Sequence, residues 1–217
     1  MVSCHSLLSS FIHSTSSSII EKIDRLRRSG LVWMAYFFFD AGDLEKQHRH
    51  GLLSSLVWQL SNSSEACRRV LYQTYSQHDE GQTEPSDDAL WQCLTFMLRE
   101  TAHRPPTYII LDAIDESPDV SGLPSEREKV LEFLENLVGL PDLPDLYLCV
   151  SSRFEENTLN NIPGRKLSIS LHQEHGQNED ILTYIKKTVN SDRKMEMWTG
   201  DEKKLVVDTL SDKSDGM

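Results

Sequence analysis

An apolar run that ends in a cluster of acids constrains this chain more than any other feature. Residues 107–116 read TYIILDAIDE, so four aromatic or apolar residues run directly into Asp112, and Asp115 and Glu116 follow within four positions. The run reads as a buried strand. A strand of this kind that delivers carboxylates at its end is typical of an α/β sheet, in which functional groups lie beyond the carboxyl ends of the strands.

Helical and strand patterns alternate along the chain. Dense apolar runs predict strands at LVWMAYFFFD, at TYIILD, at DLYLCVSSR and, more weakly, at RKLSISL. Apolar residues at helical spacing predict helices near residues 19–26, 52–60, 65–77, 90–98, 130–138, 178–189 and 201–213. This alternation predicts parallel βαβ units in a doubly wound, mostly parallel sheet with helices on both faces.

Composition excludes several classes of protein. The net charge of −12 argues against a general partner role for nucleic acid or anionic membranes, because both require a basic surface. The longest apolar run, residues 31–39, is far shorter than the roughly 20 residues that span a bilayer. The four cysteines are scattered and have no histidine at metal-ligand spacing, so a zinc site or a disulfide framework is not indicated. Reduced thiols in a cytoplasmic protein are expected.

Two strand exits carry the candidate functional residues. Asp112 and the segment Ser151-Ser152-Arg153 each follow a predicted strand, so both belong on one rim of the sheet. Asp112 supplies the hard oxygen that a nucleotide-bound Mg²⁺ needs, and Asp115 and Glu116 would polarise the attacking water or add to the metal shell. The alternative is that these acids cap a strand end and begin a loop.

Arg153 has two interpretations. A fixed cation at the end of a strand lies within reach of a terminal phosphate. The alternative is a surface arginine that pairs with Glu155 or Glu156.

Other polar and aromatic residues are predicted to have structural roles. Asp40 and Asp43 follow a strand and read as turn and capping residues. His48 and His50 read as solvated residues on a polar helix face. The aromatic residues of the first predicted strand read as core.

Several segments together resemble, in order, the NACHT-type core of the STAND P-loop NTPases. They are LVWMAYFFFDAGDLEKQHRHGLLSSLVWQL, YIILDAIDE, LYLCVSSRFE, NEDILTYIKKTV and LSDKSDGM. The chain is similar in particular to the nephrocystin-like NACHT domains of fungal NOD-like receptors, over residues 16–217. The resemblance implies a P-loop NTPase-like fold and a cytoplasmic signalling protein that binds ATP or GTP with Mg²⁺. It also implies hydrolysis, a conformational switch, and association with itself or with full-length NACHT relatives.

The resemblance also implies a role for each candidate residue. Asp112 matches the Walker B aspartate that binds the metal, and Asp115 and Glu116 match the catalytic acids that follow it. Arg153 matches the sensor-type arginine that contacts the nucleotide.

The chain departs from the family where the phosphate-binding loop should stand. The family has a G-x-x-x-x-G-K-[ST] loop, whose backbone amides and lysine bind the phosphates. Here the first glycine is Gly30, none of the ten glycines precedes a lysine, and Ile12 and His13 occupy the places of the lysine and the Ser/Thr. Each lost charge-assisted hydrogen bond is worth roughly 1.5–3 kcal/mol. The sequence therefore predicts impaired nucleotide binding, with the first strand and P-loop missing or degenerate.

The predicted organisation has three parts: a degenerate or mis-started segment at residues 1–15, a NACHT-like core at residues 16–190, and the start of a helical region at residues 191–217. In the family that region leads into a winged helix.

Three hypotheses stay open. The chain is a NACHT fragment with impaired nucleotide binding, a non-enzymatic α/β interaction module that docks onto full-length relatives, or an intact NTPase whose upstream exon was missed. The second hypothesis follows from the sheet edge that the missing first strand would leave unpaired.

Overall fold

A computed structural model describes most of the chain. The described residues are 4–99, 105–119, 124–141, 143, 145–153, 177–192 and 195–214. The chain divides into two compact units, Leu7–Gly164 and a second unit of Met1–Ser6 with Arg165–Met217. Each unit is described by itself. The weak strand predicted at RKLSISL lies outside the described residues.

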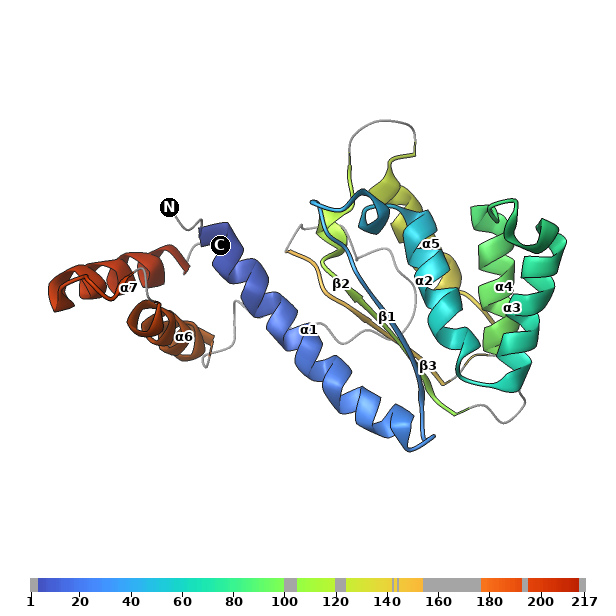
Figure 1. Ribbon diagram of the computed structural model, residues 1–217, viewed down its shortest axis with the longest axis horizontal. Helices are drawn as coiled ribbons and strands as arrows, with labels where there is room; N and C mark the ends of the chain where they lie inside the picture. The colour runs from blue at the N-terminus through green and yellow to red at the C-terminus, as the bar shows by residue number, and fades with distance from the viewer. Residues whose placement is uncertain are drawn as a thin grey trace. The chain divides into compact units, whose positions relative to one another are not determined.

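The first unit is built on a parallel sheet (Figure 1). The described strands are β1 (Trp33–Phe38), β2 (Thr107–Asp112) and β3 (Leu146–Val150), in the spatial order β1-β2-β3. Both pairings are parallel. The register sets Phe38 opposite Asp112 and Leu111 opposite Val150, so all three strands end at the same rim. The α/β fold class with a parallel sheet is therefore confirmed.

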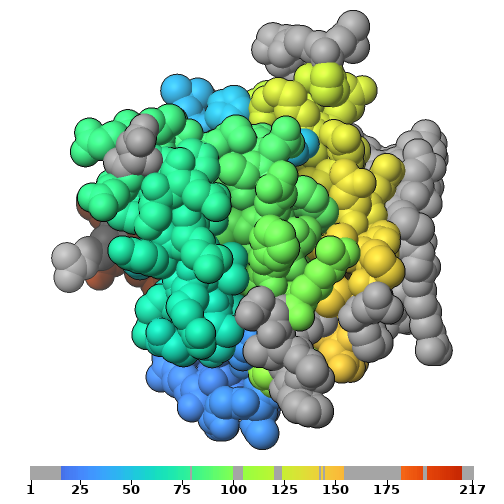
Figure 2. Space-filling view, turned by 90° about the vertical axis from the view of Figure 1, so that its right-hand side faces the viewer, coloured from blue at the N-terminus to red at the C-terminus, as the bar shows by residue number. Residues whose placement is uncertain are grey.

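Helices cover both faces of this sheet, as the alternating pattern predicted (Figure 1). One face carries α1 (Cys4–Arg28), which precedes β1 and begins earlier in the chain than its apolar periodicity indicates. The other face carries α2 (Arg49–Ser61) and α5 (Glu126–Val138). Against α2 pack α3 (Glu65–Gln77) and α4 (Asp87–Arg99), and these two helices form a continuous outer surface beside α5 (Figure 2).

The hydrophobic core lies between the sheet and the helices α2 to α5. Because side chains alternate along a strand, Trp33, Ala35 and Phe37 of β1 face this core. Phe39, just after β1, is completely buried and packs edge-to-face on Phe37 with 5.0 Å between ring centroids. The helices contribute mainly leucines, which explains their helical spacing in the sequence. The fully buried leucines of α2 and α4 are Leu52, Leu53, Leu56, Leu60, Leu94 and Leu98.

Short turns join the strands to the helices at the rim. Asp40 Oδ1 accepts a hydrogen bond from the Gly42 amide, 2.9 Å away. Asp43 caps the short 3₁₀ helix η1 (Leu44–Lys46) by accepting from the Glu45 amide. The prediction that these two aspartates serve turns and caps is confirmed.

The second unit contains a pair of helices, α6 (Gln177–Ser191) and α7 (Gly200–Ser214). They pack on each other through Ile185, Val189 and Val207. The two predicted terminal helices are thus confirmed. None of the helices in the described part of the chain has the length and apolar character needed to cross a membrane.

Candidate functional site

Asp112 lies at the centre of the candidate site. It is the last residue of the middle strand β2, and its side chain is completely buried. Two serine hydroxyls donate hydrogen bonds to its Oδ1 atom: that of Ser16 on α1, at 2.6 Å, and that of Ser151 just after β3. A carboxylate removed from water in this way needs such donors, because burying it unpaired is costly. Asp112 therefore joins α1, β2 and the end of β3.

Ser151 also holds the backbone that turns the chain after β2. Its hydroxyl accepts a hydrogen bond from the Ala113 amide at 3.0 Å, and its own amide donates to the Leu111 carbonyl at 2.9 Å. Ala113 has a φ of 56° and a ψ of 48°, in the left-handed region that non-glycine residues rarely adopt. Ser151 thus helps to hold the turn that carries the next two acids.

Asp115 pairs with Arg153. Its Oδ1 accepts from the Arg153 amide at 3.0 Å, and its Oδ2 lies 3.2 Å from the Arg153 Nε. Asp115 is almost buried, with 8% of its side chain exposed, whereas 53% of the Arg153 side chain is exposed. Among the described residues, Arg153 therefore pairs with the rim acid Asp115, and Glu155 and Glu156 of the alternative interpretation lie outside them.

Glu116 and Ser117 connect the acidic turn to the segment after β1. Glu116 Oε2 accepts from the Ala41 amide at 3.0 Å, and the Ser117 hydroxyl donates to the Gln47 carbonyl at 2.8 Å. The acids of this turn therefore do more than cap β2. Glu116 bonds to the segment after β1 and Asp115 to the segment after β3, so they link the ends of neighbouring strands.

An open pocket of about 450 Å³ lies over these residues. Three carboxylates and two guanidinium groups line it, which is a formal charge of −1; they belong to Asp115, Glu116, Asp119, Arg127 and Arg153. Arg127, with 16% of its side chain exposed, donates to the Asp115 carbonyl at 2.7 Å and lies 3.5 Å from the Asp119 carboxylate. The predicted site residues Asp115, Glu116 and Arg153 are thus brought to one pocket, while Asp112 lies buried at the strand end beside them.

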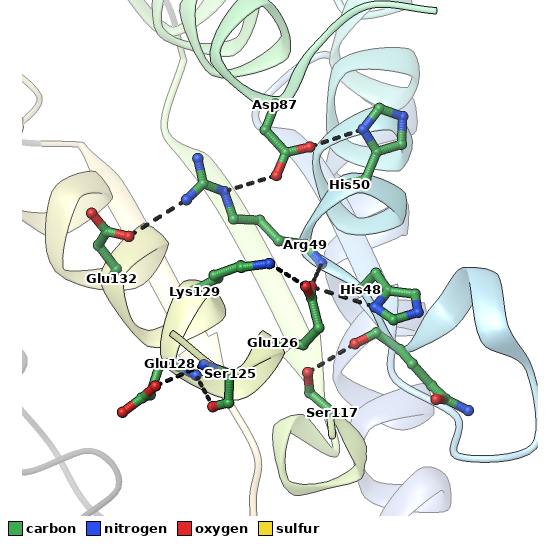
Figure 3. Close-up of polar contacts among 11 residues, drawn as sticks. His48, Arg49, His50, Asp87, Ser117, Ser125, Glu126, Glu128, Lys129 and Glu132 are labelled. Carbon is green, nitrogen blue, oxygen red and sulfur yellow. Dashed lines mark hydrogen bonds and ion pairs between the residues drawn. The ribbon is translucent and has the colours of Figure 1, made fainter. Parts of the chain in front are cut away.

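A second polar network lies at the start of α2 (Figure 3). Glu126, from α5, accepts from the Arg49 amide at 3.3 Å and so caps α2 from another helix, since the N-cap residue His48 makes no side-chain cap. His48 itself lies 3.4 Å from the same carboxylate, and His50 lies 2.8 Å from Asp87 of α4. Both histidines are solvated as predicted, with 45% and 36% of their side chains exposed, and each ring also lies beside a carboxylate.

The guanidinium of Arg49 completes this network (Figure 3). It lies 3.3 Å from Asp87 of α4 and 3.6 Å from Glu132 of α5, and 17% of the side chain is exposed. Arg49 thereby links three helices. The network supports the helical layer behind the sheet, and it is separate from the pocket.

Two ionisable groups near these sites have shifted pKa values. Burial opposes ionisation of Glu126, but the hydrogen bonds from Lys129 and from the Arg49 amide outweigh it and hold the pKa of Glu126 below its usual value. Burial, followed by the negative charge of Asp112, raises the pKa of the Cys149 thiol on β3.

The donor set around Asp112 fits Mg²⁺ in chemical type. Mg²⁺ prefers hard oxygen ligands, and nucleotide sites commonly supply one or two carboxylates while the phosphates and water provide the rest. Asp112, Ser16 and Ser151 offer such oxygens. Among the residues that the structure describes, no three acidic, histidine or cysteine side chains gather as a self-sufficient metal site.

Sequence reasoning missed one serine of this site, Ser16, and the bond that a second serine, Ser151, makes to Asp112. Ser16 lies three residues after His13, which is about one helical turn along α1, and its hydroxyl reaches Asp112. A scan of the helix for hydroxyl residues one turn beyond the expected Ser/Thr would have found it. Ser151 stood in the predicted rim segment, but its bond to Asp112 depends on the strand register.

Comparison with known families decides the relationship of this chain. The sequence model of the family described as Nephrocystin 3, N-terminal, matches residues 11–153, which is more than half of the chain. The chain belongs to this family. The nephrocystin 3 N-terminal family is NACHT-like in general kind, and the matched region contains every residue of the candidate site, from Ser16 to Arg153. Neither the curated proteins nor the solved structures include a match to the chain.

Replacing Ser151 by alanine is expected to destabilise the first unit by about 1–3 kcal/mol, because a buried acceptor on Asp112 and the Ala113 amide each lose a partner. Urea unfolding followed by circular dichroism measures the change. Ser152→Ala is the matched control, since the Ser152 hydroxyl bonds to the neighbouring Arg153 carbonyl. Equal losses in the two variants would contradict the bridging role of Ser151.

The reactivity of Cys149 is expected to report the charge of Asp112. Alkylation requires the thiolate, so its pH midpoint should lie above the ordinary thiol value of 9.0, and Asp112→Asn should move it down. Mass spectrometry of iodoacetamide-treated protein in a Cys4→Ser background measures both midpoints. A midpoint that Asp112→Asn leaves unchanged would show that the aspartate does not act on this thiol.

Proposed function

We propose that this chain is a NACHT-type signalling domain whose ancestral function is a nucleotide-controlled switch of the STAND class, and whose own binding of ATP or GTP is impaired. The observation that carries the proposal is the arrangement at the rim. Asp112 ends the middle strand with two hydroxyl groups on one oxygen, and Arg153 follows the neighbouring strand. Membership of a NACHT-like family supports the same function.

Each residue has a definite part in this proposal. Asp112 and the Ser16 hydroxyl would hold Mg²⁺ at the strand end, and the metal would neutralise charge on the nucleotide phosphates. Asp115 and Glu116 would be the two acids that orient the attacking water. Arg153 would bind the terminal phosphate through its exposed guanidinium.

The impairment follows from residues 12 and 13. Isoleucine and histidine at these positions replace the lysine and the hydroxyl residue of the family loop, and no glycine precedes residue 30. The backbone of residues 4–28 is instead helical, and a helix offers its amides to its own carbonyls along its length. Several phosphate contacts of roughly 1.5–3 kcal/mol each are absent, so we expect a Kd for ATP of roughly 1 mM.

Titration calorimetry with ATP and Mg²⁺ tests this function. Weak binding that Asp112→Asn abolishes is the expected result. Asp88→Asn is the control, because it makes the same change on a side chain of α4 that is 89% exposed. A submicromolar affinity would contradict the impairment. Binding that Asp112→Asn leaves intact, or no binding at millimolar ATP, would remove the nucleotide site from the proposal.

The second candidate function is that of a non-enzymatic module that associates with itself or with full-length NACHT relatives. The strand β3 favours it, because none of its five residues is fully buried and Tyr147 is 47% exposed. Tyr147 stacks on Tyr108 of β2 with 5.0 Å between ring centroids, which leaves an aromatic pair on the sheet. Exposed aromatic and apolar strand residues of this kind suit pairing with another chain.

Pull-down of a full-length NACHT relative, with size-exclusion chromatography for self-association, tests the second function. Tyr147→Lys should abolish the association, because a charge would then face the partner. Tyr72→Lys, on the exposed face of α3, is the control at a side chain that is 67% exposed. A monomer that binds no relative would rule out this function.

A further inference from the structure

The ion pair of Asp115 and Arg153 joins a fixed residue to a movable one. Asp115 is held twice: its carboxylate accepts from the Arg153 amide, and its carbonyl accepts from Arg127, which has 16% of its own side chain exposed. The Arg153 side chain is 53% exposed and reaches Asp115 through its Nε. The guanidinium can therefore leave the carboxylate at the cost of one ion pair, while the bond from the Arg153 amide keeps the Asp115 carboxylate in place.

The net negative charge of the pocket disfavours the binding of an anion in this arrangement. Its lining carries a formal charge of −1, from three carboxylates and two guanidinium groups. Both guanidinium groups are paired there, Arg127 with Asp119 and Arg153 with Asp115. A phosphate that enters the pocket must therefore compete with Asp115 for Arg153.

We infer that the Asp115–Arg153 pair is an autoinhibitory contact, which withholds Arg153 from a terminal phosphate until the phosphate displaces Asp115. This inference rests on the phosphate-binding role proposed for Arg153. It changes the role of Asp115, which then regulates the site through Arg153 and does not act on the water. The pair has two states, and a phosphate ligand selects the released one because it gains the cation only there.

The test is the affinity for inorganic tripolyphosphate in Mg²⁺-free buffer with a chelator, measured by calorimetry. Asp115→Asn removes the competing charge but keeps an oxygen for the Arg153 amide, and we expect about fivefold tighter binding. Asp119→Asn is the matched control, because it removes the same charge from the same pocket at a side chain that pairs with Arg127. We expect about a twofold change or less in this control.

A measurement without ligand accompanies the titration. The Nε–Hε signal of Arg153, assigned by its loss in Arg153→Lys, should exchange slowly with water in the wild-type chain and faster in Asp115→Asn. Equal tightening in Asp115→Asn and Asp119→Asn, no binding by either variant, or rapid Nε–Hε exchange in the wild-type chain would each overturn the inference. Failure of the nucleotide site would appear separately, as Mg²⁺-ATP binding that does not depend on Asp112.

Discussion

Phe39→Ala is expected to destabilise the first unit by about 3–5 kcal/mol, which is the usual cost of removing a completely buried phenylalanine. The side chain lies in the core between the sheet and α2, in edge-to-face contact with Phe37. Its amide donates to the Asp112 carbonyl at 3.0 Å, so the cavity would open directly beneath the candidate site. Urea unfolding followed by circular dichroism measures the loss.

Phe96→Ala provides the comparison for this prediction. The Phe96 side chain lies on the outer surface of α4 and is 60% exposed, so its removal should change stability by less than about 0.5 kcal/mol. If Phe39→Ala cost under about 1 kcal/mol, or if both variants lost the same amount, the position of Phe39 in the core would be wrong.

Gly51→Ala is the second variant with a large expected effect on stability. It should destabilise the protein, whereas replacing glycine by alanine in a helix usually stabilises it. Alanine in a helix is normally more stable than glycine by about 1 kcal/mol. A Cβ atom on Gly51, in the first turn of α2, would lie 2.0 Å from the Glu45 carbonyl oxygen of η1. Because that oxygen belongs to the backbone, η1 or α2 must shift, and we expect a net loss of about 1–3 kcal/mol.

Thermal unfolding of the two single variants, Gly51→Ala and Gly200→Ala, tests the close approach of η1 to α2. A Cβ atom on Gly200, at the start of α7, meets nothing within 4 Å, so that variant should be neutral or slightly more stable. Stabilisation of the chain by Gly51→Ala would show that η1 does not press against α2.

The parts of the fold that follow from local pattern could be predicted from the sequence. Dense apolar runs marked β1 and β2 because strands buried on both faces need apolar residues at every position. Leucines at helical spacing marked α2 and α4 because one stripe of each helix faces the core. Asp112 and Arg153 were assigned to one rim because parallel strands end on the same side, and the observed register confirms it.

The partners of the site residues needed the tertiary structure. Ser16 and Asp112 are separated by 96 residues, and no local periodicity relates them. Among the described residues, Arg153 pairs with Asp115, because the sheet register brings the ends of β2 and β3 together. Similarly, the sequence did not show that the exposed histidines His48 and His50 lie beside carboxylates of α5 and α4.

The physical reason for this division is the range of the interactions. Secondary structure and its order follow from hydrophobic periodicity and from turn residues. These are local patterns, which extend over about ten positions of the chain. Hydrogen bonds and ion pairs at the rim depend on distances of about 3 Å between residues far apart in the chain, and these exist only after the elements have packed. The sequence therefore predicted an α/β chain with an acidic rim and without a phosphate-binding loop, and packing decided which side chains meet there.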